Sequence, residues 1–117
     1  MNNIAEELKQ RTKQFAVMVI KFCRTLSKDD ESTIIKRQII RSATSTAANY
    51  RAVCRARSDA EFYSKLCIVV EEADETLFWL ELITELEISN NPALKKCFDE
   101  ATELVKIFSK SRKTAKK

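Results

Sequence analysis

Apolar residues recur with the period of an α-helix in four successive segments of the chain. When each residue is given a turn of about 100°, the apolar positions of residues 3–27 gather on one side of the helical wheel. This first face is made of Ile4, Leu8, Phe15, Met18, Val19, Phe22, Cys23 and Leu26. Residues 33–56 form a second face from Ile35, Ile39, Ala43, Thr46, Ala47, Tyr50, Val53 and Cys54. Each segment therefore predicts a helix that buries one side.

The second half of the chain carries two more faces of this kind. Residues 58–88 align Phe62, Leu66, Val69, Val70, Ala73, Leu77, Leu80, Ile83 and Ile88. The fourth segment, from residue 92 to residue 110, aligns Leu94, Cys97, Phe98, Ala101, Leu104, Val105 and Phe108. No segment shows a convincing alternation of period two, so the sequence predicts helices and no strand.

The expected helix ends carry capping signals. Asp30 and Ser32 are candidate N-caps of the second helix. Ser58 and Glu61 form the S-x-x-E capping box, in which the two side chains satisfy free backbone amides at the start of the third. The Asn-Asn-Pro sequence at 90–92 is expected to end the third helix and begin the fourth, because Asn tolerates the left-handed conformation, Asn91 can act as N-cap and Pro suits the first helical position.

Small residues fill the middle of the second segment. Residues 42–48 read Ser-Ala-Thr-Ser-Thr-Ala-Ala, which lowers intrinsic helix stability but lets a neighbouring helix approach closely. A loop is the alternative, since Ser and Thr side chains compete for backbone hydrogen bonds. The helical interpretation is preferred because the apolar period continues through the stretch.

Four long helices with short connections are typical of a bundle with antiparallel neighbours. The 117 residues are enough for one hydrophobic core and too few for two. We therefore expect an all-α, antiparallel up-and-down four-helix bundle over residues 1–110, followed by a basic, flexible tail over residues 111–117.

The composition removes most kinds of enzyme site. The chain contains no Gly and no His, and Pro92 is its one proline. Glycine-rich phosphate loops, nucleophile elbows and dinucleotide fingerprints therefore cannot form. A His-activated nucleophile and an imidazole metal ligand are equally impossible. We expect a protein that is not an enzyme and that holds neither a cofactor nor a metal ion.

The cysteines and the hydropathy indicate a cytoplasmic protein. Cys23, Cys54, Cys67 and Cys97 form no CxxC pair, and each falls in a helical repeat, so we expect small buried thiols in a reducing compartment. No apolar run approaches the roughly 18 to 20 residues of a membrane-spanning helix, and the charged first thirty residues do not fit a signal peptide. No contact with a membrane is expected.

The third segment has a second apolar side. Ile68, Trp79, Leu82 and Leu86 cluster away from its main stripe. A helix that is apolar on two sides must bury both, and Trp is enriched at protein interfaces, so this cluster predicts a subunit contact in a homo-oligomer. One alternative is a central third helix that buries both sides in a single core. Binding of a small molecule in the same groove is a further, weaker alternative.

Charge is divided sharply between the helices. Residues 58–88 hold nine acids and a single base, Lys65, and so carry a net charge of −8. On the second helix, one strip of the wheel carries the four residues of what we call the arginine strip: Arg37, Arg41, Arg51 and Arg55. Only the small Thr44 and Ala48 lie between them. The tail adds further basic residues, among them Arg112 and Lys113.

Two interpretations of the arginine strip remain open. Guanidinium groups bind phosphates bidentately and a polyanion gains affinity from counterion release, so the strip and the tail are candidates for contact with RNA or DNA. Alternatively, the strip pairs with the acidic third helix, within or between subunits. The carboxylates Glu71, Glu72, Asp74 and Glu75 lack companion ligands and are expected to form a solvated or paired face rather than a metal site.

Two stretches resemble a known family. They are Arg41-Ser-Ala-Thr-Ser-Thr-Ala-Ala-Asn49-Tyr-Arg-Ala, which runs on through Arg55-Ala-Arg-Ser58, and Glu71-Glu-Ala-Asp-Glu-Thr-Leu-Phe-Trp-Leu-Glu-Leu82. The chain resembles, over nearly its whole length, the four-helix bundle proteins that include the product of intervening sequences in bacterial large-subunit ribosomal RNA genes.

The resemblance implies an up-and-down helical protomer that forms a ring-like homopentamer in bacteria. A similar protein serves as accessory factor to the reverse transcriptase of diversity-generating retroelements, where a basic surface contacts nucleic acid. Many members continue the Asn with Ile-Ala-Glu-Gly, whereas Tyr50-Arg51-Ala52-Val53 follows here, which indicates a subgroup without the Gly-dependent bend. We expect a non-catalytic oligomeric scaffold or adaptor, with a nucleic-acid-binding accessory protein as the alternative and an enzyme as a third hypothesis that no residue spacing supports.

Overall fold

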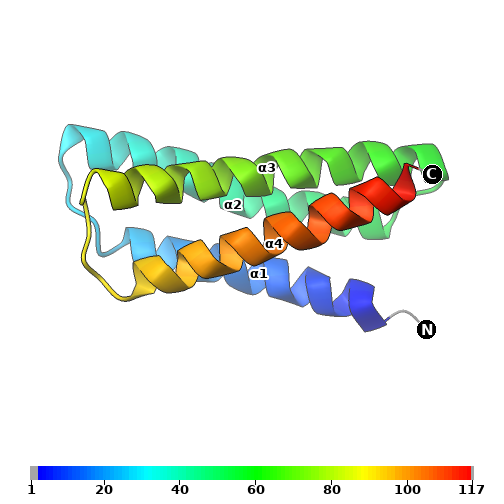
Figure 1. The fold of residues 1–117 in the computed structure, drawn as a ribbon, viewed down its shortest axis with the longest axis horizontal. Coiled ribbons are helices and arrows are strands. Elements are labelled where there is room, and N and C mark those ends of the chain that lie inside the picture. The colour runs from blue at the N-terminus through cyan, green and yellow to red at the C-terminus, as the bar shows by residue number, and fades with distance from the viewer. Residues whose placement is uncertain (1–2, 117) are drawn as a thin grey trace.

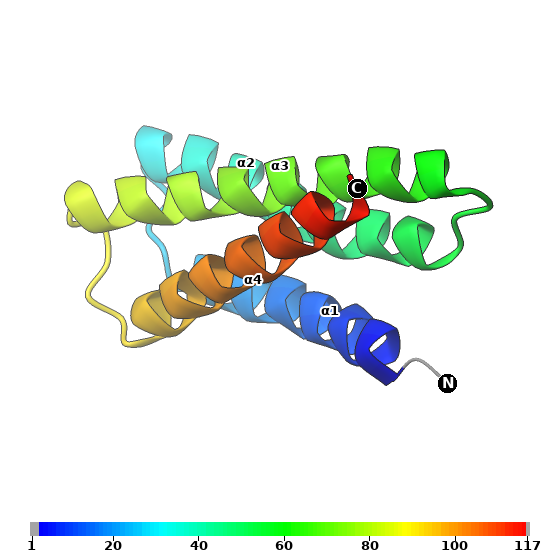
Figure 2. The same ribbon diagram turned by 45° about the vertical axis from the view of Figure 1, so that its right-hand side comes forward.

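The computed structural model describes residues 3–116, which form four α-helices in an antiparallel bundle (Figure 1). The helices are α1 Asn3–Cys23, α2 Asp30–Cys54, α3 Asp59–Glu85 and α4 Ala93–Ala115. Each helix packs on its neighbours in sequence and α4 packs on α1, so α2 and α4 stand diagonally. Figure 2 shows α4 crossing obliquely from the C-terminal end of α1 toward the N-terminal end of α3. The predicted all-α four-helix bundle is confirmed.

One apolar core runs along the axis of the bundle. Its largest fully buried side chains come from all four helices: Phe15, Phe22, Ile39, Leu66, Leu80, Ile83, Leu104 and Phe108. Tyr50 of α2 reaches Phe108 of α4 across the diagonal, with ring centroids 5.2 Å apart. The wheel analysis placed Ile4 on the buried face of α1, but its side chain is 67% exposed because it lies in the first turn of the helix.

The small-residue stretch of α2 is helical throughout, so the loop alternative is wrong. Its hydroxyls bond back to carbonyls one turn earlier, as in Thr46 Oγ1 to Ser42 O at 2.8 Å, and the backbone ladder is kept. Ser42 Oγ also lies 2.7 Å from Thr76 Oγ1 of α3, and both residues are fully buried. The short side chains therefore bring α2 and α3 close together, as expected.

Two of the three predicted starts of helices carry the expected cap. Ser58 accepts a hydrogen bond from Glu61 N at 3.0 Å, although the Glu61 carboxylate accepts from Arg57 N rather than from the cap residue. Asn91 Oδ1 accepts from Ala93 N at 2.9 Å. For α2 the candidates were wrong, because Asp29 is the N-cap and accepts from Ser32 N.

The other helix ends differ from the predicted ones. Helix α1 ends at Cys23, earlier than expected, where a turn begins. Helix α3 ends at Glu85 rather than in the Asn pair, and Glu87 takes the left-handed conformation with φ 53°. The amides of Glu87 and Ile88 bond to the carbonyls of Thr84 and Ile83, which is the Schellman arrangement.

Helix α4 continues to Ala115, into the segment expected to be a tail. No Gly or Pro interrupts the helix, and Ala115 packs against the core. Arg112 and Lys113 lie in its last turn, where their positive charge interacts favourably with the helix dipole. Lys117, the end of the expected tail, lies outside the described residues. Across residues 3–116 the helices are too short or too polar to cross a membrane.

Candidate functional site

The arginine strip lies on the outward face of α2. Arg37, Arg41, Arg51 and Arg55 are all exposed, as are the two small residues between them, Thr44 and Ala48. The strip runs from Arg37 to Arg55, which is about 27 Å of helix axis. All four arginine side chains are thus open to solvent.

Arg41 is held by α3 of the same chain. Its Nη1 donates to Glu72 Oε2 at 2.8 Å and its Nη2 donates to Glu75 Oε2. Glu75 also accepts from Trp79 Nε1 at 3.0 Å. The hydrogen bond from Arg41 holds the pKa of the Glu75 carboxyl below its ordinary value. Partial burial opposes this shift, and the hydrogen bond from Trp79 adds to it. The pairing interpretation of the strip is therefore correct for Arg41.

The other three arginines of the strip are not paired in this way. Within residues 3–116, Arg37, Arg51 and Arg55 make neither a side-chain hydrogen bond nor an ion pair of 4 Å or less. Arg112 and Lys113 do not extend the strip, since they sit on α4, diagonally across from α2. The predicted phosphate-binding residues thus form two separate groups.

The second apolar side of α3 is only partly exposed. Ile68, Trp79 and Leu82 are half-buried, Trp79 packs against the core, and Leu86 is 52% exposed. Phe78, which the wheel analysis overlooked, is 47% exposed and meets the Trp79 ring edge-on with centroids 5.0 Å apart. The most accessible apolar groups on this side are therefore Phe78 and Leu86, with Trp79 supporting Phe78 from the flank.

Phe78 lies in a line of exposed carboxylates. The five residues of this line, which we call the acidic ridge, are Glu71, Asp74, Phe78, Glu81 and Glu85. They recur at helical spacing along α3, and all are exposed. Among the described residues these four carboxylates make no ion pair and accept no side-chain hydrogen bond. No group of three or more potential metal ligands converges in the part of the chain that the structure describes.

A shallow groove separates α1 from α2 beside the arginine strip. Its volume is about 430 Å³. The apolar part of its wall consists of Ala16, Val17, Ile20, Ala47 and Ala48. Its basic part consists of Lys9, Lys13 and Arg51, with Glu6 as the one acid, 3.3 Å from Lys9. This groove takes residues from two helices, and the wheel analysis of single helices did not find it.

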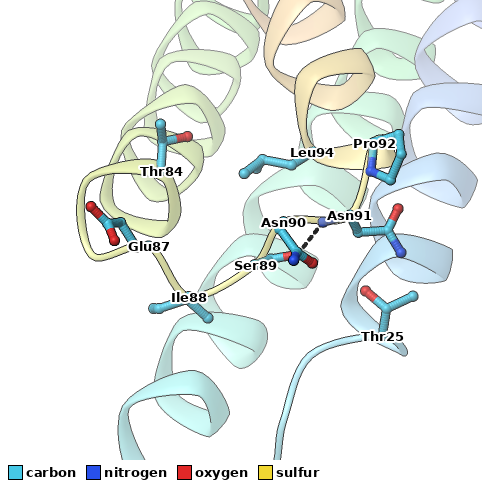
Figure 3. Close-up of a pocket in the computed structure, with 9 residues that line it drawn as sticks. All are labelled: Thr25, Thr84, Glu87, Ile88, Ser89, Asn90, Asn91, Pro92 and Leu94. Carbon is cyan, nitrogen blue, oxygen red and sulfur yellow. Dashed lines mark hydrogen bonds between the residues drawn. The ribbon is translucent and has the colours of Figure 1, made fainter.

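A second hollow lies at the end of the bundle, around the loop between α3 and α4 (Figure 3). It measures about 830 Å³ and is lined by amides and hydroxyls, with Glu87 as the one titratable side chain. In Figure 3 the Asn91 amide donates to Ser89 Oγ, a bond of 3.1 Å that shapes the loop itself. A single carboxylate without a partner acid or base gives this hollow no evident catalytic chemistry.

The cysteines differ in accessibility. Cys23 and Cys97 are buried, and desolvation raises the pKa of their thiols to about 12 and about 11. Both thiols are therefore protonated and unreactive at neutral pH. Cys67 is half-buried and Cys54, in the last turn of α2, is exposed, so the expectation of buried thiols holds for Cys23 and Cys97 only.

Comparisons with known proteins agree with this fold. The family model of the 23S rRNA-intervening sequence protein matches residues 5–110. A crystal structure of a protein of unknown function from Bacteroides thetaiotaomicron VPI-5482, from the S23 ribosomal protein family, superposes with a TM-score of 0.80. The two sequences are 32% identical over 90% of this chain and 97% of that one. No curated protein matches the chain significantly. With nearly the whole bundle covered, the chain belongs to the 23S rRNA-intervening sequence protein family.

Proposed function

We propose that this protein is a non-catalytic scaffold or adaptor that works as a homo-oligomer, with the outer face of α3 in the subunit contact. The observation that carries this proposal is the exposure of Phe78 and Leu86 on one face of α3, beside the half-buried Trp79. By likeness to the family, a ring of five copies is the assembly we propose.

Exposed aromatic rings of this kind are costly in a monomer. Phe78 leaves about half of its side chain in water although Trp79 already holds one edge of the ring. Aromatic residues are enriched in protein interfaces, where a rigid ring buries much area at a small loss of conformational entropy. The Phe78–Trp79 pair is therefore prepared to pack against a further surface.

Substitutions at this face test the proposal. Light scattering of the wild-type protein at micromolar concentration should give a defined multiple of the chain mass. Phe78→Glu and Leu86→Glu should each lower that mass while circular dichroism stays unchanged, because both side chains are exposed and neither is needed for the core. Trp79→Asp should do the same but also disturbs core packing, which makes it the less clean variant.

Gln14→Glu is the matched control, since it adds the same charge at an exposed position of α1. Loss of assembly in this variant as well would show that added charge, not the α3 face, governs the mass. A wild-type protein with the mass of one chain would overturn the proposal.

A nucleic-acid-binding accessory role is the second candidate. It is favoured by the three unpaired arginines of the strip and by the ribosomal RNA context in the family's description. RNA binding followed by fluorescence anisotropy should weaken steeply as salt rises. Replacing Arg51 and Arg55 by Ala should reduce the salt slope by about 1 for each phosphate that an arginine no longer neutralises. An unchanged slope would remove the strip from the binding surface, and Lys95→Ala on α4 is the control.

A further inference from the structure

The acidic ridge and part of the arginine strip share one spacing. From Glu71, the ridge residues follow at 3, 7, 10 and 14 positions, with Phe78 in the middle. From Arg41, the exposed residues Thr44, Ala48, Arg51 and Arg55 follow at the same 3, 7, 10 and 14 positions, with Ala48 in the middle and Arg55 as the C-cap of α2. Each set is a straight seam of about 21 Å on its helix, which is the geometry by which one helix faces another.

The two seams are also opposite in chemistry. The ridge surrounds a large aromatic side chain with carboxylates, whereas the α2 seam surrounds a methyl group with guanidinium groups. Ala48 is part of the wall of the α1–α2 groove, and Val17 beside it is exposed. The groove therefore offers an apolar recess at the position that corresponds to Phe78.

We propose that the acidic ridge of α3 docks along the α1–α2 groove of a second copy of this chain, with Phe78 in the groove beside Ala48. This inference rests on the proposed homo-oligomeric function and names the surfaces that meet. The ridge of one subunit faces the arginine strip of the next. Each subunit therefore contacts one neighbour through its ridge and another neighbour through its α1–α2 groove.

Charge excludes the simpler arrangement in which two ridges meet. The four carboxylates of one ridge would then face the four carboxylates of the other ridge. Like charges placed opposite each other across an interface strongly oppose association. Two arginine strips facing each other meet the same objection. The complementary arrangement removes both repulsions, and a contact between two different surfaces repeats from copy to copy until it closes as a ring or grows as a filament.

Arg51 and Arg55 lie opposite acidic residues whether α3 of the second copy runs parallel or antiparallel to α2. With Phe78 opposite Ala48 and the helices parallel, Arg51 lies at the position of Glu81 and Arg55 at that of Glu85. With the helices antiparallel, Arg55 lies at the position of Glu71 and Arg51 lies one residue from the position of Asp74. Arg41 is already held by its own α3, so Arg51 and Arg55 carry the contact.

Charge reversal on each surface, followed by mixing, tests the inference. The ridge variant is Glu81→Lys/Glu85→Lys and the strip variant is Arg51→Glu/Arg55→Glu. Alone, each should raise the dissociation constant of the assembly at least about a hundredfold, because attraction becomes repulsion. Mixed in equal amounts, the two variants should associate in alternating order, because lysines of one then face glutamates of the other. A ring of five cannot alternate throughout, so the mixture should form assemblies with an even number of copies. The chain that carries all four reversals should regain the wild-type mass.

Glu7→Lys/Glu103→Lys is the control for the ridge variant, with the same change of net charge at exposed positions of α1 and α4, and it should assemble as the wild type does. Mass is read by light scattering and native mass spectrometry, with circular dichroism to verify folding.

The outcomes separate this inference from the function on which it rests. If the wild type assembles but the ridge and strip variants assemble equally well, or if neither mixing nor fourfold reversal restores assembly, the docking surfaces are wrong and self-assembly stands. If the wild type is a monomer, with or without RNA on the strip, both the inference and the proposed function are wrong.

Discussion

Ser42 Oγ and Thr76 Oγ1 lie 2.7 Å apart in the interior, where α2 and α3 pack, and neither residue is exposed to solvent. Each hydroxyl also lies within hydrogen-bonding distance of a carbonyl of its own helix. Two short polar side chains thus bring the helices together without leaving an unsatisfied group. The small-residue stretch of α2 thus allows α2 and α3 to pack closely.

Substitutions at Ser42 should separate packing from hydrogen bonding. Ser42→Ala should lower the free energy of unfolding by about 1 kcal/mol, because Thr76 keeps its bond to the Glu72 carbonyl. Ser42→Leu should lower it by about 1 to 3 kcal/mol or more, since the larger side chain forces α2 and α3 apart. Urea unfolding measures both. Equal losses in the two variants would contradict a role for close helix packing.

Glu87 is the position at which a substitution should stabilise the protein. It holds φ at 53°, a conformation that costs roughly 1 to 2 kcal/mol for residues with a Cβ and that Gly adopts freely. Glu87→Gly should therefore raise the free energy of unfolding by about 0.5 to 1 kcal/mol in thermal or urea unfolding. Glu87→Ala removes the carboxylate but keeps the Cβ, so it should bring no gain. Stabilisation by both would point to charge instead of backbone conformation.

The Arg41–Glu75 pair should make Trp79 a reporter of pH. The lowered pKa of Glu75 means that its ionised form favours the folded state. That contribution is complete above the pKa of the unfolded chain and is lost as pH falls through the lower pKa of the folded state. Trp79, the one tryptophan, donates to Glu75, so its emission should change with a midpoint below the ordinary pKa of a glutamate side chain.

Arg41→Ala should move that midpoint upward, because the main cause of the shift is removed. The loss of stability at neutral pH should be at most about 1 kcal/mol, since the arginine side chain is 49% exposed. Arg37→Ala, on the same helix but without a partner in its own chain, should leave the midpoint in place. A midpoint that Arg41→Ala does not move would show that another group sets the pKa.

Thiol labelling should follow burial. Of the four cysteines, Cys54 should react first with a thiol reagent in the native protein, whereas Cys23 and Cys97 should react only as fast as the bundle opens. Mass spectrometry of peptides after brief labelling identifies the modified residues. Early labelling of Cys23 or Cys97 would contradict the closed packing of α1 against α4.

The sequence predicted the helices because each apolar face is formed within one continuous segment. Ser58 was found for the same reason, since a capping box is a local pattern. The end of α3 was misplaced because the left-handed conformation of Glu87 has no local signal in the sequence, whereas Ile88, which follows it, packs against the core.

The candidate surfaces were harder to predict. Phe78 was overlooked because acids surround it on the wheel of its helix. The α1–α2 groove joins residues about thirty positions apart, so it appears only once the helices are placed together. The matched spacing of the ridge and the α2 seam is present in the sequence, but its significance depends on the exposure of every one of these residues.

Self-assembly through the α3 face is the central claim, and the solution mass of the wild-type protein tests it most directly. Light scattering coupled to size-exclusion chromatography at micromolar concentration should give one species with a whole-number multiple of the chain mass, and the multiple should fall when Phe78 is replaced by Glu. A species with the mass of a single chain at every concentration measured would contradict the claim.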